Sequence, residues 1–258
     1  MNIKKTHFLF DKTKKAQLCK KEILKKFKNF SPKISDAIVV IGGDGFMLQA
    51  LKKYEKLKKP FYGMNKGNFG FLMNKYKKNN LIKFISKAKK INISPLQMYA
   101  LTNKKTTKTA IAINEVSLLR QSRQTAYLKV KVNNKTIIKK LICDGVMVST
   151  PAGSTAYNLS AHGPILSLNS GKLAVTPISP FRPRRWKGLV VSNKSYIIIN
   201  NVDDNKRPVS VVADNIEVRN IKKVKIKINK FRKFSLLYDK KNSLSKKIKV
   251  EQLIHRKY

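Results

Sequence analysis

Hydrophobic and polar positions follow two different periods along the chain, and the change falls near Pro95. Before it, short apolar runs alternate with segments in which apolar residues recur every three or four positions. We expect strands over 3–10, 37–41 and from 61, and helices over 12–30, 46–59 and 79–89. Strands and helices that alternate in this way predict a right-handed parallel sheet with helices packed on it.

From about residue 97 to 230, apolar and polar residues alternate with period two, as in half-buried strands. Lys129–Val132 and Thr136–Ile138 flank Asn133-Asn134, a good hairpin signal. Further strands are expected over 195–200, 209–212 and 224–228, with one helix-like island at 155–161. This half is predicted to be an antiparallel, sandwich-like β domain.

The expected organisation is therefore α/β plus β. We place an N-terminal α/β domain over 1–95, a C-terminal β-rich domain over 96–230 and a tail over 231–258. The hydrophobic content of 42% is ordinary for a globular protein. No apolar run approaches the roughly 20 residues that a membrane span needs, and the patch at 8–10 is too short for a signal peptide.

The two cysteines, Cys19 and Cys143, have neither metal-binding spacing nor the number for a disulfide framework. A cytoplasmic protein with free thiols and no membrane partner is the simplest expectation. The formal net charge of +44 favours a partner rich in phosphate, such as nucleic acid, a nucleotide or polyphosphate. Lysine is spread over the whole chain, however, without the local arginine and aromatic patch of a nucleic-acid reader. We attribute the charge to compositional bias and expect weak non-specific adhesion but no specific nucleic-acid partner.

The segment 36–48 runs from β-branched apolar residues into Gly42-Gly43-Asp44-Gly45 and a helical pattern. It predicts a buried strand, a tight turn and a helix start, where backbone N–H groups can approach a phosphate. Asp44 is unexpected there, because a carboxylate repels phosphate unless it holds a metal, accepts a hydroxyl proton, or both. The alternative is a turn in which Asp-Gly merely suits the backbone.

A second polar segment, 143–160, places a buried strand before a turn rich in hydroxyl groups and a short helix. Ser154 or Thr155 can cap that helix. The Asn158 amide and the Tyr157 ring suit a ribose, a phosphate or a base, while a capped helix start without a ligand explains the pattern equally well. Ser154 lacks the Gly-x-Ser-x-Gly context of a nucleophile, and no Walker A motif is present.

A third element, Asn114-Glu115, offers an amide for a base edge and a carboxylate for ribose hydroxyls, although a simple turn also accounts for it. Taken together and in this order, the three segments and 63–72 closely resemble the NAD kinase family. The block Thr150-Pro151-Ala152-Gly153-Ser154-Thr155-Ala156-Tyr157 is the most specific part of the resemblance.

The resemblance implies an enzyme that phosphorylates the 2′-hydroxyl of the adenosine ribose of NAD, using ATP or polyphosphate with Mg²⁺. It implies an active site between the two domains, a homodimer or homotetramer, and a tail that returns to the first domain. Asp44 would be the general base, Gly42, Gly43 and Gly45 would shape the phosphate loop, and Asp144 would bind another ribose or the nicotinamide side. The residues implied in binding the dinucleotide are Asn114, Glu115, Thr155, Ala156, Tyr157, Asn158, Ser160 and Asn215.

The chain departs from the family pattern at a few positions. Ile142 stands where many relatives carry a charge, Ala152 replaces a commoner Thr, and Asn215 stands where relatives carry Gln or His. The arginines of 182–185 either meet phosphates or a neighbouring subunit, or form a basic surface loop pinned by Trp186. Two other functions fit part of the sequence: a lipid or sugar kinase with the same glycine-aspartate turn, and a basic nucleic-acid-binding protein.

Overall fold

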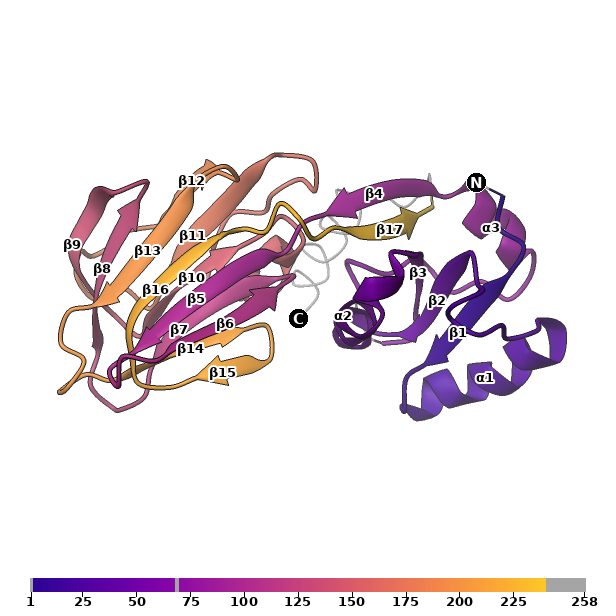
Figure 1. The fold of residues 1–258 in the computed structure, drawn as a ribbon, viewed down its shortest axis with the longest axis horizontal. Coiled ribbons are helices and arrows are strands. Elements are labelled where there is room, and N and C mark those ends of the chain that lie inside the picture. The colour runs from indigo at the N-terminus through magenta and orange to yellow at the C-terminus, as the bar shows by residue number, and fades with distance from the viewer. Residues whose placement is uncertain (1, 68–69, 240–258) are drawn as a thin grey trace, which may run out of the picture. The chain divides into compact units, whose positions relative to one another are not determined.

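The computed structural model describes residues 2–67 and 70–239, which fall into two compact units (Figure 1). Unit one comprises Met1–Ile93 and Lys233–Tyr258, and unit two comprises Ser94–Arg232. Most of the tail expected over 231–258 lies outside the described residues, because the description ends at residue 239. Unit two is thus inserted, in sequence, between two segments of unit one.

Helices in unit one form where apolar residues recur with helical spacing. Its helices are α1 (Lys14–Lys26), α2 (Asp44–Lys53), the 3-10 turn η1 (Glu55–Leu57) and α3 (Leu81–Lys87). In α1 the buried residues are Ala16, Cys19 and Ile23, which share one face.

The sheet of unit one is mixed, with parallel strands and one antiparallel edge. Its strands are β1 (Thr6–Phe10), β2 (Ala37–Gly42), β3 (Pro60–Asn65), β4 (Lys89–Ile93) and β17 (Phe234–Tyr238). The strand order is β1-β2-β3-β17-β4. Neighbours from β1 to β17 run parallel, and β4 is antiparallel to β17. All six residues of β2 are buried, as expected for the centre of a parallel sheet.

Helix α2 differs from its predicted bounds of 46–59 at both ends. It begins at Asp44, since an acidic residue is favourable in the first turn, next to the positive end of the helix dipole. It ends at Lys53, after which η1 forms a tighter turn and Lys58 adopts a left-handed conformation with φ 51°. The prediction that the helix extends to Pro60 was therefore wrong.

Strands β4 and β17 were not predicted, because their pairing links segments far apart in the chain. Asn74 connects β17 to the loop after β3: its amide nitrogen donates to Leu237 O at 2.8 Å, and its side-chain oxygen accepts from Asp239 N at 2.9 Å. Tyr62 also donates to the Asp239 carboxylate, at 2.9 Å. The segment from Lys233 is thus held within the sheet of unit one.

Unit two consists of two six-stranded antiparallel sheets. One sheet has the order β12 (Leu189–Ser192), β11 (Lys172–Ile178), β10 (Gly145–Ser149), β7 (Glu115–Arg120), β14 (Val209–Ala213) and β15 (Ile216–Val218). The other has the order β6 (Thr107–Ala112), β5 (Leu96–Thr102), β16 (Ile221–Ile228), β13 (Tyr196–Asn201), β8 (Ala126–Val132) and β9 (Lys135–Cys143). The predicted β8–β9 hairpin is confirmed, and Asn133 and Asn134 both have positive φ, as a type I′ turn requires.

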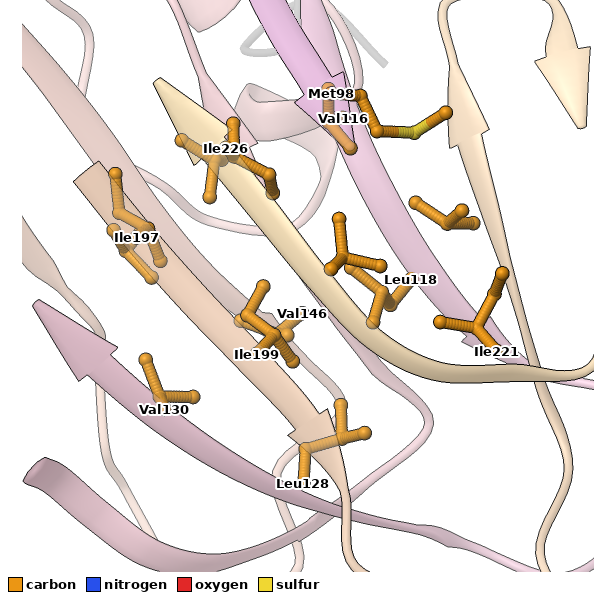
Figure 2. Close-up of a cluster of buried hydrophobic side chains, with 14 of the residues drawn as sticks. Met98, Val116, Leu118, Leu128, Val130, Val146, Ile197, Ile199, Ile221 and Ile226 are labelled. Carbon is orange, nitrogen blue, oxygen red and sulfur yellow. The ribbon is translucent and has the colours of Figure 1, made fainter. Parts of the chain in front are cut away.

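The core of unit two lies between these sheets. Val116, Leu118 and Val146 come from one sheet, and Ile197 and Ile226 from the other (Figure 2). All five are fully buried. The alternation of buried and exposed residues along these strands explains the period-two pattern, and the predicted class, an α/β domain followed by an antiparallel β domain, is confirmed.

Within residues 2–67 and 70–239, the helices are too short and too polar to cross a bilayer. Cys19 and Cys143 are both free and buried. The expectation of free thiols agrees with the structure.

Replacement of Asn74 by alanine is expected to lower the free energy of unfolding by about 2–3 kcal/mol, because it removes the buried side chain that bonds to Leu237 O in β17 and to Asp239 N just after it. Denaturant titration would measure the change. Asn79→Ala is the matched control, since Asn79 is exposed and its side chain contacts Lys26 Nζ at the surface. An equal effect of the two replacements would contradict the role assigned to Asn74.

Candidate functional site

The predicted glycine turn of unit one connects the end of β2 to the start of α2. Gly42 is the last residue of β2, and a Cβ there would lie 2.9 Å from the Asp11 Cβ. A second glycine-rich segment, residues 63–72, lies next to this turn. Gly43 precedes α2, and a Cβ on Gly67 of this second glycine segment would lie 3.3 Å from the Gly43 Cα. Lys66 N donates to Gly42 O at 2.8 Å. The two glycine segments therefore approach each other at the carboxyl edge of the parallel strands.

Gly45 has no such packing constraint. A Cβ at this position would meet nothing within 4 Å. The missing side chain leaves open space beside the first turn of α2, where backbone N–H groups have no partner within the helix.

Asp44 is held by the second glycine segment. Its Oδ2 accepts a hydrogen bond from Phe71 N at 2.7 Å, and its Oδ1 accepts one from Leu72 N at 3.1 Å. These two amides fix the orientation of the carboxylate. The Tyr238 hydroxyl donates to Phe71 O at 3.4 Å, and burial together with the Asp44 charge raises the pKa of Tyr238. The Asp44 carboxylate, which was unexpected in a turn suited to phosphate, thus links this turn to residues 71–72.

A second group of predicted residues gathers at one edge of a sheet in unit two. Strands β10 and β14 both run antiparallel to β7, so the start of β7 lies beside the ends of its two neighbours. Glu115 pairs with Ser149 in this register, and Asp214 N donates to Glu115 O at 3.2 Å. The antiparallel topology therefore brings 113–115, 149–150 and Asp214 together.

Thr150 and Gly153 fasten the hydroxyl-rich turn to the Asn114 segment. The Thr150 hydroxyl donates to Ile113 O at 2.7 Å and accepts from Gly153 N at 3.1 Å. Thr150 N donates to Asn114 O at 2.9 Å. A Cβ on Gly153 would lie 2.3 Å from Asn114 O, so only glycine fits there.

Two oxygen atoms at this edge are buried without a hydrogen-bond partner among the described residues: Asn114 Oδ1 and Glu115 Oε2. Buried polar groups are normally paired, so both atoms are suited to a ligand that brings its own donors. Burial, and next the charge of Asp214, raises the pKa of Glu115 to about 7. Hydroxyl or amide groups of a ligand would supply the missing donors.

The helix-like island consists of the 3-10 turn η2 (Gly153–Thr155) and one α-helical turn, α4 (Tyr157–Ser160). The prediction that Ser154 or Thr155 caps this helix was wrong, because Ala156 precedes α4 and no side chain caps it. Ser154 is instead used within the turn: its hydroxyl donates to Pro151 O at 2.8 Å and accepts from Leu166 N at 3.0 Å.

Asn158 is fully buried, and its amide is occupied by the protein itself. Its nitrogen donates to Ser154 O at 3.1 Å and to Pro164 O at 3.0 Å, and its oxygen accepts from the Thr176 hydroxyl at 2.7 Å. The Asn158 side chain therefore stabilises the conformation of the turn that contains η2 and α4. Tyr157 and Ser160 are exposed, Ala156 is partly exposed and Thr155 is buried.

Comparison with known proteins agrees with this description. A sequence model of the ATP-NAD kinase N-terminal domain matches residues 2–90, and one of the ATP-NAD kinase C-terminal domain matches residues 113–237. The NAD kinase of Caulobacter vibrioides is 44% identical over 237 residues, which cover 92% of this chain and 91% of that protein. The chain belongs to the NAD kinase family. The resemblance inferred from the motifs is confirmed.

Three further proteins are similar over most of this chain. The NAD kinase of Zymomonas mobilis is 46% identical over 242 residues, covering 93% of this chain and 94% of that protein. Yeast NADH kinase complexed with NADH has a TM-score of 0.75 at 22% identity, covering 92% of this chain and 76% of that chain. The Archaeoglobus fulgidus NAD kinase in complex with ATP has a TM-score of 0.75 at 23% identity, covering 95% and 99%. These two structures show that the fold is shared.

Asp144, which the family resemblance also implicates, lies apart from the Asn114–Glu115 edge. It precedes β10, whereas Thr150 follows it, so the two sit at opposite ends of a strand, about 20 Å apart at roughly 3.3 Å per residue. The Arg120 Nε donates to the Asp144 carboxylate at 2.5 Å. Asp144 and Thr150, although close in sequence, thus lie at different ends of β10.

The remaining positions lie on the surface. Asn215 is exposed in the turn between β14 and β15. The guanidinium groups of Arg182 and Arg184 lie 5.1 and 5.7 Å from the Phe181 ring centroid, and Trp186 packs against the core of unit two. Ile142 forms backbone hydrogen bonds with Arg182. Arg182 and Arg184 thus lie exposed in a loop that Trp186 anchors, and contacts of these arginines with phosphates or a neighbouring subunit stay a prediction.

Glu115 gives the stability of the protein a specific pH dependence. The raised pKa means that the folded chain keeps a proton that the unfolded chain has lost, so stability falls as the pH rises from about 4.5 to 7. Relative to wild type, Glu115→Gln is expected to gain about 2 kcal/mol in unfolding free energy between pH 5 and pH 8. Denaturant titrations at the two pH values test this. Glu217→Gln, at an exposed position of β15, should show no such gain, and a flat response of Glu115→Gln would refute the assignment.

Proposed function

We propose that this member of the NAD kinase family transfers a phosphoryl group from ATP or polyphosphate to the 2′-hydroxyl of the adenosine ribose of NAD. The observation that carries the proposal is the pair of buried, unpartnered oxygens on Asn114 and Glu115. They lie in a chain whose relatives at 44% and 46% identity are NAD kinases. The ligands of the two solved structures, NADH and ATP, are consistent with these substrates.

We assign the general base to Asp44. A hydroxyl that attacks a phosphoryl group needs alignment, charge neutralisation and a proton acceptor within hydrogen-bond reach. The Asp44 carboxylate is oriented by the amides of Phe71 and Leu72, which supports its assignment as that acceptor. Gly42, Gly43 and Gly45 would then shape the loop that receives the phosphates.

In the same proposal, Asn114 and Glu115 hold the adenosine part of NAD. The turn from Thr155 to Ser160 lines the dinucleotide pocket through Thr155, Ala156, Tyr157 and Ser160, while Asn158 fixes the shape of that turn from inside. Asp144 binds the other ribose or the nicotinamide side. Asn215 is the remaining candidate for a contact with NAD.

A divalent cation fits this proposal as a companion of the phosphoryl donor. No three His, Cys, Asp or Glu side chains come together as metal ligands in residues 2–67 and 70–239. Mg²⁺ is commonly held by one or two carboxylates together with substrate phosphates, and Asp44 is the carboxylate at the glycine turn. Bound there, the cation would neutralise charge on the transferred group. We also carry over a homodimer or homotetramer from the family.

Asp44→Asn is expected to lower the rate of NADP formation by at least 10²-fold, because the amide cannot accept a proton from the ribose hydroxyl. The assay contains NAD, ATP and Mg²⁺. Asp36→Asn is the matched control: Asp36 also accepts two backbone hydrogen bonds, from Lys4 and Lys5, but it precedes β2, at the strand end opposite the glycine turn. Wild-type activity of a folded Asp44→Asn protein would contradict the assignment of Asp44 as the general base.

The donor is tested with a panel that contains ATP, other nucleoside triphosphates and polyphosphate. We expect NADP from ATP or from polyphosphate, identified by product analysis. The absence of NADP with every donor would overturn the proposed reaction.

A further inference from the structure

We propose that Asp214 is a positioning residue of the NAD site, which fixes the Asn114–Glu115 backbone and couples NAD binding to the ionisation of Glu115. The inference rests on the proposed roles of Asn114 and Glu115 as NAD-binding residues. It concerns a side chain that need not touch the substrate itself.

The Asp214 carboxylate accepts hydrogen bonds from three consecutive amides: Ile113 N at 2.8 Å, Asn114 N at 2.9 Å and Glu115 N at 3.4 Å. Asp214 N donates in return to Glu115 O at 3.2 Å. A carboxylate is a strong acceptor for backbone N–H groups, so this clamp fixes the segment that carries both unpartnered oxygens.

The backbone of Asp214 has an unusual conformation. It has φ 53°, in the left-handed region, and it closes the two-residue turn between β14 and β15. Non-glycine residues seldom adopt this conformation, and aspartate tolerates it better than most others. The turn aims the carboxylate back at residues 113–115, because Ala213 and Val116 are paired across the two strands.

Asp214 also acts on Glu115 through its negative charge. Asp214 is the charge that acts on Glu115 from the β14 side, and it opposes ionisation of a carboxyl group whose Oε2 is already buried. On the other side, β10 presents Ser149 and Thr150, and from 145 to 161 the sole ionisable side chain is Tyr157. No basic group on that side offsets the Asp214 charge. Glu115 therefore changes its protonation close to neutral pH.

This has a direct consequence for substrate binding. An ionised Glu115 accepts hydrogen bonds from ribose hydroxyls through both oxygens, whereas the protonated form has lost acceptor capacity. NAD should bind preferentially to the ionised form and release a proton as it binds. For a single linked group that titrates near pH 7, the KM for NAD should rise about tenfold from pH 8 to pH 6.

Initial-rate kinetics with saturating ATP and Mg²⁺, from pH 6 to pH 8.5, test the proposal. In Asp214→Asn the KM for NAD at pH 8 should rise about tenfold with kcat changed less than about threefold, since the loss of amide hydrogen bonds loosens the binding segment. The midpoint of its pH dependence should move to lower pH, because Glu115 has lost its negative neighbour. A purely structural role would not move this midpoint.

Two further variants separate position from charge. Asp214→Glu keeps the charge but displaces the carboxylate, so it should raise KM while the midpoint stays near pH 7. Glu115→Gln should make KM independent of pH. Asp203→Asn is the matched control, since Asp203 also accepts a backbone hydrogen bond in a turn of unit two, from Lys206 N at 3.3 Å, and it should behave as wild type.

The wild-type protein provides a test that needs no variant. Calorimetry of NAD binding at pH 7, in buffers of different ionisation enthalpy, should show release of about half a proton per NAD. The absence of proton release, or an unchanged KM and midpoint in Asp214→Asn, would overturn the inference. If instead Asn114→Ala and Glu115→Gln leave the KM for NAD unchanged, the NAD-site assignment itself fails.

Discussion

The hydrogen bond from backbone amide to aspartate carboxylate is the interaction on which both candidate regions depend. Chain segments that leave a strand or enter a helix expose N–H groups that regular structure no longer satisfies. In unit one, Asp44 accepts two such groups and ties its own turn to the second glycine segment. In unit two, Asp214 accepts three from the Asn114–Glu115 segment. Each region is thus shaped by one carboxylate bonded to a distant stretch of backbone.

Sheet topology decides which side chains these carboxylates can organise. Because β7 lies between two antiparallel partners, the residues that begin it meet the residues that end β10 and β14. Strand β10 itself separates Asp144 from Thr150, although the two are close in sequence. The close contact between Gly153 and Asn114 O leaves the backbone of both segments little conformational freedom. The polar groups at this edge are therefore positioned by backbone geometry more than by side-chain flexibility.

The sequence predicts what local patterns control. The hairpin at Asn133-Asn134, the buried strand before Gly42 and the period-two strands of unit two all follow from neighbouring residues, and the structure agrees. It does not predict β17, whose partners lie more than 140 residues away in β3 and β4. The Asp44 contacts were missed for the same reason, since Phe71 and Leu72 are distant in sequence. The Asp214-Asn215 pair after an apolar run marks a turn, but the three amides that donate to its carboxylate lie about 100 residues away and could not be predicted.

The position of β17 has a consequence for how the chain is made. This strand lies between β3 and β4 in the sheet of unit one, yet it follows the whole of unit two in the sequence. During synthesis the nascent unit one has to wait, with a gap in its sheet, until the segment after Lys233 leaves the ribosome. Unit two, a continuous stretch of chain, can form its sandwich during that interval. Unit two can therefore complete its fold before unit one, although unit one begins first in the sequence.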